Sequence, residues 1–180
     1  MRKPIEVQSL DITLATGSDP QRMQSRDGAR LALGIPPTAF VAICTAPDES
    51  VLDAWREVCS FFPYAILLVA SPAHERMPFG PQTVRWIGER DDVRTLFAAS
   101  DIHVHSAEGS RDELLDALRA GVPTIAAENA TSRALLLDGR SGLLIAPRNS
   151  RALASSILLL ASAPAVRAEL ARGALNTALL

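Results

Sequence analysis

Short apolar segments alternate with longer segments of helical periodicity from about residue 39 to the end of the chain. This alternation is typical of βαβ units, in which helices connect parallel strands. The first two apolar segments are apolar at nearly every position, as expected for strands that are buried on both faces. We therefore predict six strands, at residues 40–45, 65–70, 84–87, 102–105, 124–127 and 142–145.

The segments between and after these strands show the spacing of amphipathic helices. Leu153, Ile157 and Leu160, for example, recur at i, i+4 and i+7 and so share one helix face. Pro164 suits the first turn of a final helix, where a missing N–H leaves no helical hydrogen bond unmade. The expected helices cover residues 49–60, 92–99, 110–120, 131–137, 150–162 and 165–174.

The hydrophobic pattern predicts the secondary structure of the first forty residues less clearly. Residues 11–14 could form an edge strand, followed by turn-forming residues at 16–20. A helical stretch at 25–33 then ends at Gly34. We find no internal repeat or low-complexity linker, so we predict one α/β domain over residues 1–180, a doubly wound parallel sheet. Its ligand site is expected beyond the carboxyl ends of the strands.

Composition narrows the class of protein. With 48% apolar and 21% charged residues in 180, the chain is typical of a globular domain and unlike disordered, collagenous or coiled-coil sequences. Its longest apolar runs are far shorter than the ~20 residues of a membrane span. The basic start is not followed by an apolar stretch, so it does not resemble a signal peptide. We expect a cytoplasmic protein.

Charge and cysteine usage exclude further classes. The net charge of −2 argues against nucleic-acid binding, which needs a clustered basic face. Lys3 is the only lysine, so no candidate site along the chain can use a catalytic lysine. Cys44 and Cys59 form neither a disulfide framework nor zinc-ligand spacing, and we expect buried thiols.

The most specific pattern runs from residue 84 to residue 147. It contains V-R-W-I-G, then A-S-D before a strand, then A-E-G-S at a turn, then A-G-V-P-T-I-A-A and finally D-G-R-S-G-L-L-I. This order and spacing resembles the donor-binding C-terminal domain of family-4 glycosyltransferases of the GT-B fold. The resemblance implies a Rossmann-like domain that takes part in sugar transfer from a nucleotide sugar, with retention of configuration, in cell-surface polysaccharide or glycoconjugate synthesis. It implies no metal cofactor.

Local chemistry also favours a ligand site at this turn. A strand is expected to end at residue 105, and a helix to begin near Ser110 after a turn that contains Gly109. Free backbone N–H groups and the positive end of the helix dipole would then face an anion such as a diphosphate. Alternatively, Ser110 only caps the helix, and Glu113 completes a capping box.

The resemblance assigns roles to individual residues. Glu108 would be catalytic, facing the donor sugar near the reacting carbon, and Asp116 would accept hydrogen bonds from the ribose, although the family has Glu there. The backbone of residues 109–111 would bind the diphosphate. The expected donor-binding set is Gly109, Ser110, Arg111, Asp116, Trp86 and Thr45.

One departure from the family pattern concerns charge. The family carries an Arg and a Lys after the first strand to neutralise the leaving diphosphate, whereas residues 44–50 contain no cation. Arg111 is our first candidate to replace them, with Arg90 and Arg76 as rivals.

Two hypotheses follow. In the first, the chain is the donor-binding half of a glycosyltransferase whose acceptor-binding N-terminal half is missing. It would then work with an acceptor-binding domain or partner chain, and the full enzyme could associate peripherally with a membrane. Alternatively, it is a non-catalytic module that keeps this fold for binding or assembly.

Two histidines form a separate pattern. His103 and His105 alternate on a predicted strand, so both side chains lie on one face and could hold a transition metal. The sequence offers no evident third ligand nearby. We therefore favour metal-free core or cleft histidines.

Overall fold

The computed structural model describes residues 25–71, 83–88 and 92–179. The expected edge strand at 11–14 and the turn at 16–20 lie outside these residues. Each of the six predicted strands is present, and the first three are shortened by one residue at one or both ends. They are β1 (Val41–Cys44), β2 (Ile66–Val69), β3 (Val84–Trp86), β4 (Ile102–His105), β5 (Thr124–Ala127) and β6 (Gly142–Ile145).

The helices also follow the predicted positions, including the stretch near residue 25. Ser25, Asp48, Ser110, Asn129 and Asn149 each cap a helix by accepting a backbone N–H through the side chain. The described helices are α2 (Arg26–Ala32), α3 (Glu49–Phe61), α4 (Val93–Ala99), α5 (Arg111–Arg119), α6 (Ala130–Leu135), α7 (Ser150–Ser162) and α8 (Pro164–Thr177).

The strands form one parallel sheet in the order β3-β2-β1-β4-β5-β6. This order confirms the predicted doubly wound, Rossmann-like fold. The direction of winding reverses between β1 and β4, whose register pairs Ala42 with Ile102 and Ile43 with His103. Folds of this kind bind ligands at such a switch point, beside the loops that follow the two strands.

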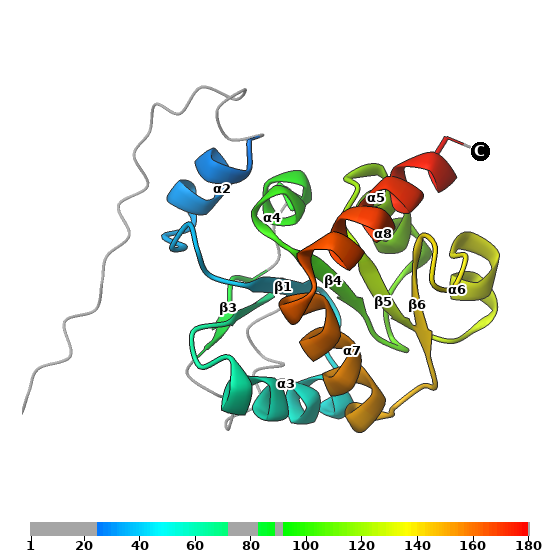
Figure 1. Cartoon of the computed structure of the whole chain (residues 1–180), viewed down its shortest axis with the longest axis horizontal. Coiled ribbons are helices and arrows are strands. Elements are labelled where there is room, and N and C mark those ends of the chain that lie inside the picture. Colours follow the sequence, from blue (N-terminus) through cyan, green and yellow to red (C-terminus); the bar gives the residue numbers. More distant parts are fainter. Residues whose placement is uncertain (1–24, 72–82, 89–91, 180) are drawn as a thin grey trace, which may run out of the picture.

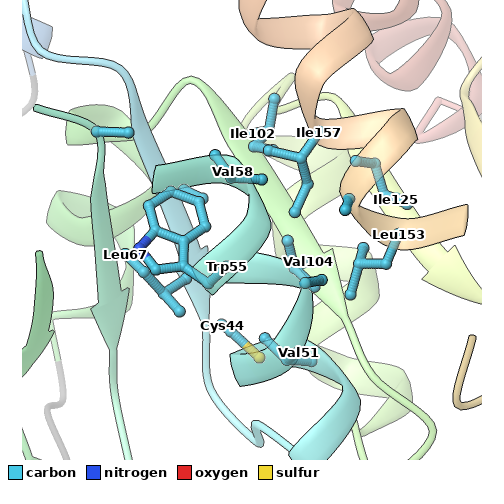
Figure 2. Close-up of a cluster of buried hydrophobic side chains, with 14 of the residues drawn as sticks. Cys44, Val51, Trp55, Val58, Leu67, Ile102, Val104, Ile125, Leu153 and Ile157 are labelled. Carbon is cyan, nitrogen blue, oxygen red and sulfur yellow. The ribbon is translucent and has the colours of Figure 1, made fainter. Parts of the chain in front are cut away.

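Helices cover both faces of the sheet (Figure 1). On one face, α3 and α7 bury a cluster that includes Trp55, Val104 and Ile157, shown in Figure 2. On the other, α2 and α4 pack over Ile43 and Leu68. The strands consequently alternate their side chains between two apolar layers, which explains the nearly continuous apolar character of β1 and β2.

None of the described helices is by itself both long and apolar enough to cross a membrane. By length and composition, α7 and α8 pass that test as a pair, but they are bent by 103° relative to each other. The apolar side chains of Leu153, Ile157 and Leu160 in α7 are buried in the core. They account for the apolar character of this helix.

A buried ion pair holds α2 against the amino ends of β1 and β4. The Arg30 guanidinium is 1% exposed, lies 2.9 Å from Asp101 and donates to the carbonyls of Pro37 (2.7 Å) and Ala39 (2.9 Å). Asp101 also accepts the Val41 N–H at 2.8 Å and pairs with the half-exposed Arg26 at 2.7 Å. One carboxylate therefore fixes a helix and the start of a central strand.

We predict that Asp101→Asn lowers the free energy of unfolding by about 3 kcal/mol or more, because it leaves the Arg30 charge buried without its counterion. The matched control is Asp53→Asn, which removes an exposed partner of Arg56 and should cost less than about 1 kcal/mol. Urea denaturation measures both changes. Similar losses for the two variants would contradict this account of the ion pair.

Candidate functional site

The loop of residues 106–110 lies at the carboxyl end of β4 and contacts the loop after β1. Its Ser106 hydroxyl donates to the Ala46 carbonyl and accepts the Glu108 N–H at 3.1 Å. The Gly109 N–H donates to the Ser106 carbonyl at 3.2 Å. The bond to Ala46 ties the loop to the residues after β1, and the other two hold the turn within the loop.

Gly109 allows this loop to lie directly on a histidine ring. A Cβ at this position would come within 2.5 Å of both Cε1 and Nδ1 of His105. No side chain fits there without moving the loop or the ring. The sequence predicted Gly109 as a ligand-facing backbone position, and the structure adds a packing reason for glycine.

The start of α5 leaves backbone donors unused by the helix. The Ser110 hydroxyl accepts the Glu113 N–H at 3.2 Å, which confirms the predicted N-cap. The first α-helical bond runs from the Leu114 N–H to the Ser110 carbonyl at 3.3 Å. The amides of Arg111 and Asp112 therefore precede the helical hydrogen-bond ladder and are suited to an anion.

The two carboxylates singled out in the sequence both lie at the surface. Glu108 Oε1 is 3.5 Å from Arg148 Nη2, and Asp116 Oδ1 in the middle of α5 is 3.4 Å from Arg119 Nη1. Each carboxylate is thus accessible and only weakly held by an exposed ion pair. Their roles toward a ligand stay predictions.

A cavity of about 400 Å³ lies between the loop after β1 and the loop after β6. Arg148, from the β6–α7 loop, is its one cationic lining residue among the described residues, and also the partner of Glu108. Sequence reasoning missed Arg148, although it is the first arginine after β6. The other lining residues are Asp48, Glu49, Ser50, Asp53 and Ser150.

A larger cavity, of about 630 Å³, includes Phe40, Phe61 and Asp101 in its lining. These residues precede β1, β2 and β4, so this cavity lies at the opposite, amino edge of the sheet. We place the candidate site at the carboxyl edge because the unused amides and the reversal of winding between β1 and β4 are found there.

The remaining predicted residues are spread around this edge. Arg111 is exposed and borders a different cavity, between α5 and α6. Trp86 ends β3 and packs partly buried against the core cluster under α3. Thr45 directly follows β1 and interacts with the Glu113 carboxylate. Arg76 and Arg90 lie outside the described residues.

Beneath the loop, His103, His105 and Glu113 form a buried polar cluster. His103 Nε2 lies 2.6 Å from Glu113 Oε1, and His105 Nδ1 lies 3.9 Å from Glu113 Oε2. The carboxylate of Glu113 therefore turns inward to His103, and the predicted capping box is only half formed. The helical spacing of Glu113 with the buried Leu114 and Ala117 was the signal that could have placed it on the inner face.

The cluster also alters the acidity of its members. Burial raises the pKa of Glu113, but the hydrogen bond and charge of His103 outweigh this effect and lower the pKa to about 2. Burial lowers the pKa of His105 to about 4, assisted by His103 and opposed by Glu113. At neutral pH, Glu113 is therefore a carboxylate and the His105 imidazole is neutral.

Several solved glycosyltransferases share this fold. HepE (Alr3699) of Anabaena, crystallised in complex with UDP, is 21% identical with a TM-score of 0.73, over 89% of this chain and 48% of HepE. WaaG, a glycosyltransferase involved in lipopolysaccharide biosynthesis, is 22% identical with a TM-score of 0.69, over 89% of this chain and 47% of WaaG.

A solved domain of similar length also matches. The C-terminal domain of the group 1 glycosyl transferase LpcC from Francisella tularensis is 18% identical with a TM-score of 0.67, and the match covers 91% of this chain and 97% of that domain. The chain thus spans about half the length of HepE and WaaG and nearly all of the LpcC domain. These matches establish the fold as that of GT-B C-terminal domains.

Sequence comparison supplies the family. Among curated proteins, no sequence matches this chain significantly. The family model for glycosyl transferases group 1 matches residues 49–163. This match runs from the start of α3 to the end of α7 and includes the loop of residues 106–110. The chain therefore belongs to the group 1 glycosyl transferases.

Proposed function

We propose that this chain is the donor-binding domain of a glycosyltransferase and that it binds a nucleotide sugar at the loop of residues 106–110. The observation that carries the proposal is the pair of amides, Arg111 and Asp112, left unused at the start of α5 beside the point where the winding reverses between β1 and β4. Amides at a helix N-terminus bind phosphate oxygens through both hydrogen bonds and the helix dipole. The diphosphate is the part of a nucleotide sugar that this geometry suits.

This position of the diphosphate also determines which residues contact the sugar and the ribose of the donor. Glu108 faces the transferred sugar near its reacting carbon, and Asp116 accepts hydrogen bonds from the ribose hydroxyls. Both side chains are exposed, so neither loses a buried partner when a ligand arrives. The complex of the related HepE with UDP makes UDP the first nucleotide to test.

The charge of the leaving diphosphate needs a cation. Arg148 lies 3.5 Å from Glu108 in an ion pair whose two side chains are 75% and 62% exposed. Such a pair is worth only about 0.2–1 kcal/mol, so a phosphate can recruit the guanidinium. We propose Arg148 and Arg111 as the cations that replace those missing from the loop after β1.

Sugar transfer also needs an acceptor held against the donor, because proximity supplies much of the catalysis. We propose that an acceptor-binding domain or partner chain provides this surface and that transfer retains the anomeric configuration. The reaction belongs to cell-surface polysaccharide or glycoconjugate synthesis in the cytoplasm, with the full enzyme able to associate with a membrane surface.

A second candidate function has its own support. The cavity beside Glu108 is lined by Asp48, Glu49 and Asp53, which repel a diphosphate. Residue 116 is Asp, where the family pattern has Glu. A non-catalytic module that keeps the fold for binding or assembly would explain both features.

We predict that UDP binds this chain and stabilises it by about 2.7 kcal/mol at 100 times its dissociation constant. Gly109→Ala should lower UDP affinity at least about tenfold, because the new Cβ collides with the His105 ring and displaces the loop. The double variant Gly109→Ala with His105→Ala removes the collision and should recover much of the affinity. Calorimetry and thermal unfolding measure both. UDP affinity unaffected by Gly109→Ala would contradict the loop site.

Asp116→Ala should weaken UDP binding by about 1–3 kcal/mol, because the ribose hydroxyls lose their acceptor. The control is Glu128→Ala, which removes another exposed carboxylate, one that pairs with Arg133. Isothermal calorimetry compares the two variants with the parent chain. If the two affinities match that of the parent, Asp116 belongs to the solvated face of α5.

Arg148→Ala and Arg111→Ala should each reduce affinity for UDP much more than affinity for uridine, because only UDP carries the diphosphate charge. Arg119→Ala, which removes an exposed arginine lower on α5, serves as the control. Calorimetry with both ligands gives the ratio of affinities for each variant. An unchanged ratio in both variants would remove these arginines from the mechanism and favour the non-catalytic module.

A further inference from the structure

The cluster of His103, His105 and Glu113 contains three potential metal ligands on the inner face of β4 and α5. One ligand atom from each residue lies within 4.8 Å of the other two. The residues are 0%, 1% and 9% exposed, so all three are withdrawn from solvent. Nitrogen and carboxylate donors gathered in this way are typical of transition-metal sites.

The partners of His103 suit a metal-bound imidazole. When Nε2 binds a metal ion, the ring proton lies on Nδ1, which is 3.3 Å from the Thr124 hydroxyl oxygen. That oxygen can accept the proton while the hydroxyl donates its own to the Val122 carbonyl at 3.2 Å. Nε2 then points at Glu113 Oε1, 2.6 Å away.

At 2.6 Å, either a proton on His103 Nε2 or a metal ion must lie between this nitrogen and the Glu113 oxygen. An imidazole that donates its other N–H to a fixed oxygen is the usual arrangement of a metal-bound histidine. Thr124 supplies this oxygen, and the interaction of Thr45 with Glu113 holds the carboxylate from the other side. The surroundings thus orient both groups toward one point.

His105 provides an independent observation. Neither ring nitrogen of this buried side chain has a hydrogen-bond partner among the described residues. Its Nδ1 lies 3.9 Å from Glu113 Oε2, which is too far for a hydrogen bond but within the range of an electrostatic contact. Buried polar atoms are rarely left without a partner, so an unmatched nitrogen aimed at a carboxylate indicates a missing group.

We propose that this cluster binds one divalent transition-metal ion of the zinc class through His103 Nε2, His105 Nδ1 and the Glu113 carboxylate. Tetrahedral zinc with bonds of about 2.0–2.1 Å holds its ligand atoms about 3.4 Å apart, and with three protein ligands a water molecule is the fourth. The spacing of 2.6 Å therefore opens and that of 3.9 Å closes by side-chain adjustments. Nitrogen ligands disfavour Mg²⁺ and Ca²⁺, which prefer oxygen.

The role of this ion is structural. It joins β4 to α5 directly beneath the loop of residues 106–110 and fixes the His105 ring on which Gly109 rests. The ion binds whether or not a nucleotide is present.

The test uses the untagged full chain, stripped with EDTA and dialysed. Zn²⁺ titrated by calorimetry should bind with a stoichiometry of one and raise the midpoint of thermal unfolding. Co²⁺, used as a spectroscopic probe, should show the visible absorption of a tetrahedral site. His105→Gln and Glu113→Gln should each weaken Zn²⁺ binding at least 100-fold, and Thr124→Val about 10- to 100-fold. Glu128→Gln, an exposed carboxylate variant, should bind as the parent does.

Absence of both Zn²⁺ binding and the Co²⁺ spectrum in the parent chain would overturn the proposal, and so would parent-like affinity in His105→Gln. If Glu113→Gln does not fold, His105→Gln decides the question, because the described contacts of that ring include no hydrogen bond that the substitution could break. A proton shared by His103 and Glu113 would then be the cation of the cluster.

Discussion

The pairing of β1 with β4 is the constraint on which the candidate site depends. These strands are neighbours in space although β2 and β3 lie between them in sequence, and the helices that follow them, α3 and α5, cover opposite faces of the sheet. The chain therefore leaves the two strands toward opposite faces, and folds of this kind bind ligands at the carboxyl edge beside this point. There the Ser106 hydroxyl donates to the Ala46 carbonyl and joins the two loops. The nucleotide binding that we propose depends on this edge of the sheet.

Two histidines on the inner face of β4 link the core to this edge. Nε2 of His103 would be buried without a partner if α5 did not bring Glu113 to it, so the helix and the strand must dock in one register. The backbone of Gly109 packs against the ring of His105. The site loop thus rests on the packed core, which suits backbone amides that must meet an anion without rearrangement.

The strand positions and the parallel sheet could be predicted from the sequence because the apolar segments differ so clearly from the amphipathic helices. The N-cap at Ser110 could be predicted as well, since its signal is local. The inward turn of Glu113 was missed although its spacing with Leu114 and Ala117 pointed to the inner face, because a glutamate three residues after Ser110 also fits a capping box. Arg148 was missed because it approaches Glu108 across the sheet from the loop after β6.

The central claim is that a nucleoside diphosphate binds the backbone at the start of α5. The direct measurement is a titration of ¹⁵N-labelled chain with UDP, followed by amide chemical shifts. The account predicts saturable shifts concentrated at residues 108–112, with smaller ones near Thr45 and Arg148. Shifts confined to the amino edge around Phe40 and Phe61, or none at saturating UDP, would contradict it.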